Sequence, residues 1–246
     1  MPTQRTDLLV IGGGPGGYAA AFRAADLGMD VTIVDNDDRL GGTCLIRGCI
    51  PSKALLHLAA IISEAREAGH LGLTFDPPKI DLDAIRAFKD GVVDKLTKGL
   101  GGLARQRKIT HIKGRASFGS SQRVIVSGST EFDSVAFGHA IVATGSRPAS
   151  IPLFDVGSNR VMNSTSALEL EDIPETLLVV GGGYIGLELG LVYAELGSRV
   201  TVVEMTDDLL PGADRDLVAP LQKRLAGIFE DIHLGTAVRK VSAEGD

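Results

Sequence analysis

The sequence predicts an α/β protein in which one strand–helix–strand unit occurs twice. An apolar run at residues 8–11 leads into a glycine-rich turn, a helical stretch and a second apolar run at residues 31–35. The same order of segments returns at residues 177–204. The chain also holds 31 glycines, which suits many tight turns because glycine accepts backbone conformations that other residues avoid. The repeat and its short apolar strands predict parallel sheets covered by helices, a doubly wound α/β fold.

Each copy of the unit carries a GxGxxG motif between its first strand and its helix. The first glycine permits a tight turn, the second lets the backbone approach a pyrophosphate, and the third lets the helix pack close to the strand. The helix that follows presents free N–H groups and the positive end of its dipole to phosphates. The motif glycines are Gly12, Gly14 and Gly17 in the first copy and Gly181, Gly183 and Gly186 in the second.

An acidic residue ends the second strand of each copy, Asp35 in the first and Glu204 in the second. A carboxylate at this position can accept hydrogen bonds from the ribose hydroxyls of an adenosine. A glycine-rich turn without a ligand is the alternative, but such a turn does not need the acid. We therefore interpret both copies as Rossmann-like dinucleotide-binding units.

Composition and charge narrow the functional classes. The 25 basic and 31 acidic residues give a net charge of −6, which indicates no surface for nucleic acid. No apolar run reaches the ~18 to 20 residues that a membrane span needs. The chain enters an apolar strand by Leu8, which leaves no room for a signal or transit peptide. We therefore expect a cytoplasmic protein without a nucleic-acid partner and without a membrane span.

The region between the repeats is less regular. Residues 50–67 predict a helix that starts near Pro51, and residues 81–107 predict a second helix that several glycines weaken. Short β-like runs follow at residues 109–112, 116–118, 123–126 and 139–143, and we expect them to form a β-meander. A connection rich in Ser, Pro and Asn begins at residue 146. We therefore place the domain boundary near residue 148, with domains at residues 1–148 and 149–246.

Cys44 and Cys49 are the two cysteines of the chain and follow closely on Asp35. Two thiols in a chain without a secretion signal do not indicate a structural disulfide. Cys49 lies just before a predicted helix, where the dipole and free N–H groups favour a thiolate, and Arg47 and Lys53 add positive charge. A disulfide that closes so small a ring is comparatively easy to reduce. These features predict a redox-active pair near the first dinucleotide.

Three other interpretations of the cysteines stay open. They could be buried apolar residues, although their glycine-rich surroundings are not typical of a core. A zinc site would need about four Cys or His ligands at shorter spacing, and no CxxC is present, so we expect no metal. A cysteine nucleophile activated by His57 would lack an orienting Asn or Asp. The remaining histidines show no clustering in the sequence: His70, His111, His139 and His233.

Four segments together resemble the dihydrolipoyl dehydrogenases, the FAD-dependent disulfide oxidoreductases of 2-oxo acid dehydrogenase complexes. They are residues 12–18 (GGGPGGY), 41–57 (GGTCLIRGCIPSKALLH), 143–148 (ATGSRP) and 181–188 (GGGYIGLE). The resemblance covers essentially the whole chain, and the segment with the cysteines is highly specific. Glutathione and mercuric reductases share the architecture, but the sequence that follows Cys49 is more similar to that of the dihydrolipoyl dehydrogenases.

The resemblance implies a role for each motif. The first unit would bind FAD and the second NAD, and Lys53 would lie near the flavin, paired with Glu188. Gly114 and Val238 would lie beside the two adenines. The implied catalytic residues are Cys44, Cys49, Lys53 and Glu188; the implied FAD-binding residues are Gly12, Gly14, Gly17, Asp35, Gly42, Thr43, Lys53, Gly114, Thr144 and Gly145; the implied NAD-binding residues are Gly181, Gly183, Gly186, Glu204 and Val238.

The resemblance also implies a reaction and partners. A thiolate of dihydrolipoamide would attack Cys44, Cys49 would leave as a thiolate beside the flavin, and electrons would pass through FAD to NAD⁺. The substrate would be carried by the lipoyl domain of a 2-oxo acid dehydrogenase complex, and the full-length enzyme would be a homodimer. The family continues past the position of Asp246 with central and dimerisation domains, so we expect this chain to be inactive alone. The alternatives are a related NAD(P)H-dependent disulfide reductase and an inactive nucleotide-binding chain.

Overall fold

The computed structural model describes residues 2–244, and its contacts divide the chain into two compact units. Unit 1 consists of Met1–Pro51 and Asp90–Arg147, and unit 2 consists of Ser52–Lys89 and Pro148–Asp246. The chain therefore passes between units after Arg147, close to residue 148. The expected division had placed Ser52–Lys89 in the first domain, whereas its contacts group it with the second unit.

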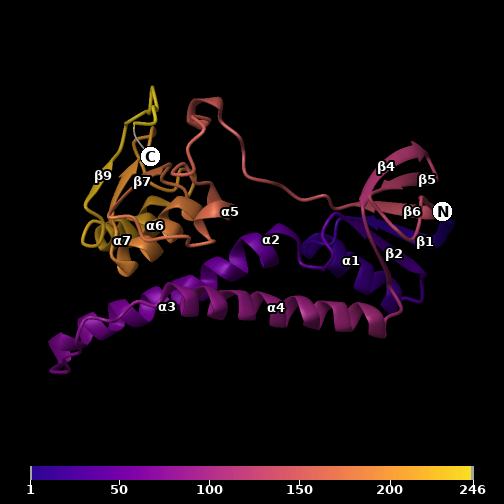
Figure 1. Cartoon of the computed structure of the whole chain (residues 1–246), viewed down its shortest axis with the longest axis horizontal. Coiled ribbons are helices and arrows are strands. Elements are labelled where there is room, and N and C mark those ends of the chain that lie inside the picture. Colours follow the sequence, from indigo (N-terminus) through magenta and orange to yellow (C-terminus); the bar gives the residue numbers. More distant parts are fainter. Residues whose placement is uncertain (1, 245–246) are drawn as a thin grey trace. The chain divides into compact units, whose positions relative to one another are not determined.

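Unit 1 is built on a six-stranded mixed sheet with the order β3-β2-β1-β6-β5-β4 (Figure 1). Neighbouring strands among β3, β2, β1 and β6 are parallel, and β4, β5 and β6 form an antiparallel meander. The predicted α/β class is therefore confirmed, and so is a meander, but the run at residues 109–112 does not belong to it: it lies in β3, which pairs in parallel with β2. The strands are β1 (Thr3–Ile11), β2 (Val31–Asp35), β3 (Thr110–Lys113), β4 (Arg115–Ser120), β5 (Arg123–Ser127) and β6 (Ser134–Val142).

The apolar run of β1 is buried on both faces of the sheet. Leu8 and Val10 belong to one core cluster, and Leu9 and Ile11 belong to the other. This alternation follows from the two-residue period of a strand. β1 begins earlier than the predicted residue 8, because residues 3–6 pair with residues 134–137 of β6. That pairing joins residues far apart in the sequence and leaves no local pattern.

Unit 1 holds α1 (Pro15–Asp26) and α2 (Gly42–Arg47). Two longer helices belong to both units: α3 (Cys49–Glu67) begins in unit 1 and continues in unit 2, and α4 (Leu82–Gln106) begins in unit 2 and continues in unit 1. α3 and α4 match the predicted helices, whereas the short helix α2 was not predicted. α4 stays helical through Gly99, Gly101 and Gly102, each of which costs roughly 1 kcal/mol relative to alanine. Leu100 and Ala104 of this helix pack against the core beneath α1, and their burial offsets that cost.

Unit 2 contains a three-stranded parallel sheet with the order β7-β8-β9 (Figure 1). Its core includes Leu55 of α3 together with Tyr193, Val202 and Leu225. The strands are β7 (Thr176–Val180), β8 (Arg199–Val203) and β9 (Asp231–His233), and the helices are α5 (Ser164–Ala167), α6 (Tyr184–Leu196) and α7 (Arg215–Leu225), with 3-10 turns at Ala68–Leu71 and Pro152–Phe154.

Hydrogen bonds explain why Ser52–Lys89 belongs to unit 2. Buried Lys89 donates to the carbonyl oxygen of Leu168 at 3.0 Å, and Arg86 donates to that of Leu170 at 2.6 Å. Tyr193 donates to the carbonyl oxygen of Ala167 at 2.9 Å, and burial raises the pKa of Tyr193 to about 12. The segment around α5 is therefore held from both α4 and α6.

One helical stretch, Gly42–Leu71, is long and apolar enough to cross a membrane, with a mean hydropathy of 1.5. The prediction that no run reaches this threshold is therefore wrong by this measure. Leu55 and Ala59 of the stretch are nonetheless 1% and 2% exposed in the core of unit 2. A core helix meets the same criterion, so the stretch is weak evidence for a membrane segment.

Candidate functional site

The predicted site residues of unit 1 gather at one edge of its sheet. Because β1, β2, β3 and β6 are parallel, their carboxyl ends meet at the same edge. The glycine loop follows β1, Asp35 ends β2, Gly114 follows β3, and Thr144 and Gly145 follow β6. Ligands of open α/β sheets bind outside this edge. The topology therefore brings residues from four parts of the chain to one place.

Both glycine loops require their first and third glycines. Gly12 has φ +107°, and a Cβ there would lie 2.1 Å from the carbonyl oxygen of Ala143. A Cβ on Gly17 would lie 1.8 Å from the oxygen of Gly12, and one on Gly186 would lie 2.6 Å from the oxygen of Gly181. Real Cβ atoms essentially never approach other atoms this closely. The third glycine therefore sets how near each helix lies to its strand.

The amino ends of α1 and α6 suit an anion. Their N-cap residues are Gly14 and Gly183, neither helix has a side-chain cap, and neither has an acidic residue in its first turn. A Cβ on Gly183 would meet no atom within 4 Å, so space is open in front of α6. Uncapped N–H groups at a positive dipole end are favourable for a phosphate. These ends therefore fit the pyrophosphates of two dinucleotides.

Asp35 closes the first glycine loop onto the end of β2. Its Oδ2 accepts a hydrogen bond from the Gly13 N–H, and its Oδ1 accepts one from the Asp37 N–H at 2.7 Å. Each carboxylate oxygen has two lone pairs, so acceptor capacity is left for ribose hydroxyls. The Gly114 N–H donates to the backbone oxygen of Asp35 at 2.7 Å, which places these two predicted residues side by side.

In unit 2, Glu204 joins the second glycine loop to the end of β8 in the same way. Its Oε2 accepts from the Gly182 N–H at 2.7 Å, and its Oε1 accepts from the N–H and hydroxyl of Thr206 at 2.7 and 2.8 Å. The backbone N–H groups of Thr206 and Gly182 lower the pKa of Glu204, although its burial opposes them. Glu204 is therefore held as a carboxylate against its glycine loop.

Gly42 and Thr43 lie against the first glycine loop at the start of α2. A Cβ on Gly42 would lie 2.5 Å from the Cα of Gly14, so only glycine allows this approach. The Thr43 hydroxyl donates to the carbonyl oxygen of Ser146 at 3.0 Å, which joins α2 to the segment after β6. The helix that carries Cys44 therefore begins in direct contact with the predicted dinucleotide loop.

The two cysteines lie on successive helices. Cys44 is half-buried on α2, and Cys49 is exposed as the first residue of α3. The sequence placed the charge of Arg47 near the thiols, and the structure joins the Arg47 guanidinium to Asp37 in an ion pair. That hydrogen bond and the charges of Asp37 and Asp35 raise the pKa of Arg47, with burial opposing them. The charged group of Arg47 is therefore paired with Asp37 in the loop after β2.

The structure bears on the three other interpretations of the cysteines: a buried apolar role, a metal site and a nucleophile activated by His57. Exposure of Cys49 argues against a buried apolar role for that residue. Among residues 2–244, no group of three or more His, Cys, Asp or Glu could hold a metal ion. His57 lies on α3 about 12 Å beyond Cys49 at 1.5 Å per residue, too far for a hydrogen bond.

Lys53 and Glu188 lie on α3 and α6, whose apolar residues share the core of unit 2. Lys53 is exposed and Glu188 is half-buried. No ion pair joins them in the part of the chain that the structure describes. Their implied pairing near a flavin therefore stays a prediction.

The implied adenine contacts also stay predictions. Gly114 has φ +156°, and a Cβ there would lie 2.6 Å from Cγ1 of Val126, so packing alone explains this glycine. Val238 is half-buried in the segment after β9.

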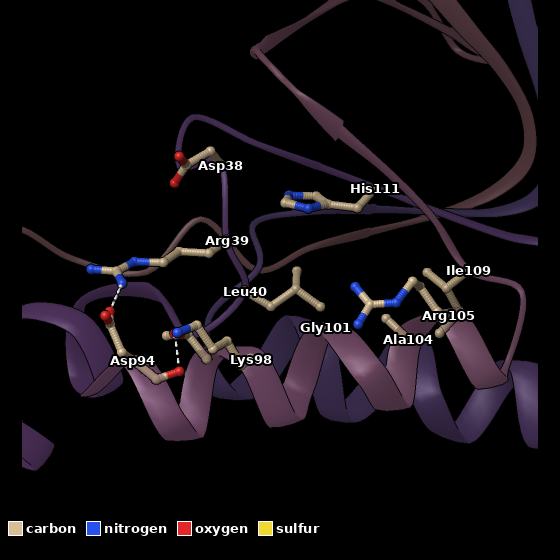
Figure 2. A pocket seen from close by; sticks show the side chains of 11 residues that line it. Asp38, Arg39, Leu40, Asp94, Lys98, Gly101, Ala104, Arg105, Ile109 and His111 are labelled. Atoms are coloured by element: carbon tan, nitrogen blue, oxygen red, sulfur yellow. Dashed lines mark hydrogen bonds and ion pairs between the residues drawn. The ribbon is translucent and has the colours of Figure 1, made fainter. Parts of the chain in front are cut away.

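Unit 1 also contains a cavity of about 460 Å³ that no motif predicted (Figure 2). It lies between α4, β3 and the loop before α2, where Arg39 and Asp94 form an ion pair at 2.6 Å. Nε2 of His111 is buried and has no hydrogen-bond partner among the described residues, and burial lowers the pKa of His111. No predicted site residue lines this cavity. Its lining residues are Asp38, Arg39, Leu40, Asp94, Thr97, Lys98, Gly101, Ala104, Arg105, Ile109 and His111.

Comparisons with known proteins agree with this geometry. The chain is 46% identical to the dihydrolipoyl dehydrogenase of Vibrio parahaemolyticus over 242 residues, which is 98% of this chain and 51% of that protein. It is also 46% identical to the dihydrolipoyl dehydrogenase of Haemophilus influenzae over 243 residues, with the same coverage. The chain therefore spans about half the length of the curated relatives it matches.

Solved structures and a family model extend the comparison. The HOCl-induced flavoprotein disulfide reductase RclA from Escherichia coli superposes with a TM-score of 0.82 at 27% identity, covering 97% of this chain and 51% of that one. A model of the pyridine nucleotide-disulphide oxidoreductases matches residues 6–246. With nearly its whole length matched, the chain belongs to the pyridine nucleotide-disulphide oxidoreductase family, as a homologue of the dihydrolipoyl dehydrogenases.

Proposed function

We propose that the chain forms the dinucleotide-binding part of a dihydrolipoyl dehydrogenase, which oxidises dihydrolipoamide to lipoamide and reduces NAD⁺. The observation that carries the proposal is the contact between the helix of Cys44 and the first glycine loop, where Gly42 approaches Gly14. In this proposal the contact would bring the thiol pair to a bound dinucleotide. The 46% identity to dihydrolipoyl dehydrogenases, against 27% to RclA, supports the lipoamide substrate over another disulfide.

In this proposal unit 1 holds FAD. The uncapped amino end of α1 would bind its pyrophosphate, and Asp35 would accept from its adenosine ribose. Thr144 and Gly145 would line the same edge from the end of β6. When bound, FAD would supply the two-electron acceptor that connects the cysteines with NAD⁺.

The cysteines would carry out thiol–disulfide exchange. A dihydrolipoyl thiolate attacks Cys44 of the Cys44–Cys49 disulfide, and Cys49 leaves as a thiolate. The second lipoyl thiol then attacks the mixed disulfide, which releases lipoamide and leaves both cysteines reduced. Two electrons and two protons pass from the substrate to the protein. Cys49, the exposed first residue of α3, would take the leaving role.

Unit 2 would bind NAD in preference to NADP. Glu204 would accept from the ribose 2′-hydroxyl and would repel a 2′-phosphate. The arginine of the same strand, Arg199, lies at its opposite end and pairs with Glu175 and Glu230 at 3.0 and 3.6 Å. Tighter binding of NADPH than of NADH would contradict the proposal.

The partners belong to the same proposal. The dihydrolipoyl group would be presented by the lipoyl domain of a 2-oxo acid dehydrogenase complex, and the full-length protein would act as a cytoplasmic homodimer. The likeness to RclA keeps a different disulfide substrate as the second candidate. Activity of the full-length protein with dihydrolipoamide, compared with other dithiols, separates the two.

A crossed pair of variants tests the assignment of the two sites. We expect Asp35→Asn to weaken FAD binding and leave NADH binding unchanged, because Asp35 accepts a hydrogen bond from the first glycine loop. We expect Glu204→Gln to weaken NADH binding and leave FAD binding unchanged. FAD is measured by flavin absorbance retained after gel filtration, and NADH by fluorescence titration. An equal effect of either variant on both dinucleotides would refute the assignment.

A further inference from the structure

We propose that Arg47 is a positioning residue that couples occupancy of the first dinucleotide site to the reactivity of Cys44. The inference rests on the proposed function of unit 1 as a dinucleotide site. It adds a route by which a ligand at the adenosine end would act on the cysteine helix, and this route consists of three consecutive contacts.

The first two contacts meet at Asp35. One of its carboxylate oxygens accepts from the N–H of Gly13 in the glycine loop, and the other accepts from the N–H of Asp37. A ribose that binds Asp35 would therefore restrain the turn 35–37 as well as the loop. Asp37 is the residue through which this restraint continues.

The third contact is the ion pair between Asp37 and Arg47. Arg47 is the last residue of α2 and lies one helical turn after Cys44. The two side chains are 28% and 35% exposed, so water screens their attraction less than that of a fully exposed pair. The end of the cysteine helix is thereby tied to the turn that follows the ribose acid.

The start of α2 is held by contacts of a different kind. The Gly41 N–H donates to the oxygen of Gly13 at 2.9 Å, and Thr43 donates to the oxygen of Ser146 at 3.0 Å. These contacts secure the first turn, whereas the Arg47 side chain reaches back from the last one. A helix of six residues secured at both ends has little freedom to expose its half-buried Cys44. A ligand that restrains the Asp37–Arg47 ion pair should therefore slow the reaction of Cys44 with a thiol reagent.

The test uses ADP as the probe and iodoacetamide as the thiol reagent, on the reduced protein. ADP carries the ribose and pyrophosphate but no flavin, so it cannot shield the cysteines with a ring system. We expect saturating ADP to slow alkylation of Cys44 about threefold or more, the size of effect that a partly exposed ion pair can transmit. Alkylation is followed at each cysteine by peptide mass spectrometry. ADP binding to unit 1 is followed by calorimetry on Glu204→Gln, which lacks the ADP contact in unit 2.

Two variants should abolish the effect of ADP without abolishing its binding. Arg47→Met removes the charge and keeps the length of the side chain, and Asp37→Asn removes the other partner. Arg47→Lys keeps the charge and should restore part of the effect. Arg39→Met is the matched control, because Arg39 lies in the loop that holds Asp37 but pairs with Asp94 on α4 (Figure 2). It should leave the effect intact.

Binding and coupling can fail separately. If ADP binds but alkylation of Cys44 is unchanged, or if Arg47→Met responds to ADP as the wild type does, the coupling is refuted while the dinucleotide site stands. If ADP does not bind, the proposed function of unit 1 fails and the coupling fails with it. Glu204→Gln removes the ADP contact in unit 2 and should not alter the response of Cys44.

Discussion

Substitution of Glu204 by glutamine is the most direct test of how unit 2 holds its glycine loop. The carboxylate accepts three hydrogen bonds, one from the Gly182 N–H and two from Thr206, and the residue is 7% exposed. Glutamine has nearly the same shape but only one acceptor oxygen. Whichever way the amide is turned, its NH₂ group faces an N–H donor that has lost its partner.

The expected cost follows from this geometry. A hydrogen bond to a charged group contributes about 1.5–3 kcal/mol, and a buried donor left unpaired costs about 1–3 kcal/mol. These two effects overlap, so we expect Glu204→Gln to lower the free energy of unfolding by about 2–4 kcal/mol at neutral pH. Glu175→Gln is the matched control, because Glu175 is 87% exposed and forms only a surface pair with Arg199. That control should cost less than about 1 kcal/mol.

The assay is urea unfolding followed by circular dichroism at a series of pH values. The folded protein lowers the pKa of Glu204 below its ordinary value of 4.5, so the unfolded state binds the proton more readily. The stabilisation is therefore present above pH 4.5 and is lost as the pH falls through the lower, folded value. The gap between wild type and Glu204→Gln should narrow in that window. A gap at neutral pH no larger than that of Glu175→Gln would refute the reasoning.

Three further outcomes are expected from urea unfolding. Gly17→Ala should destabilise the protein by about 1–3 kcal/mol or more, because its Cβ would lie 1.8 Å from a backbone oxygen, whereas Gly16→Ala, with nothing within 4 Å, should be neutral or stabilising. Burial lowers the pKa of His111, so the unfolded protein binds a proton at this residue at a higher pH than the folded protein does. The wild type should therefore lose stability below pH 6.5, and His111→Gln should lose less. Parallel pH profiles of the two proteins would contradict this. Arg66→Met should lower the free energy of unfolding by about 3 kcal/mol, because the carboxylate of Glu195, whose side chain is 1% exposed, would lose its cation. Glu195→Gln should cost less, because the Arg66 side chain that it leaves unpaired is 62% exposed. The reverse order of the two variants would count against the argument.

The sequence by itself determined the repeated units, their strand–turn–helix order and the residues that close each loop. These signals are local, because a tight turn and a close helix–strand approach demand glycine at set positions such as Gly12 and Gly17. The acid at the end of each second strand is equally local, since it bonds to the loop that its own unit supplies. The helices were also predicted locally, α3 with its start near Pro51 and α4 from its apolar periodicity.

Only the tertiary structure decided the features that depend on residues far apart in the chain. The first half of β1 forms because it pairs with β6. Ser52–Lys89 joins unit 2 because Lys89 and Arg86 donate to the carbonyl oxygens of Leu168 and Leu170. Two features depend on how side chains meet after the sheet has formed: the ion pair of Arg47 with Asp37, and the buried nitrogen of His111 that has no partner within residues 2–244. Such contacts leave no periodic pattern in the sequence, because a single pairing fixes no spacing of apolar or glycine residues around it.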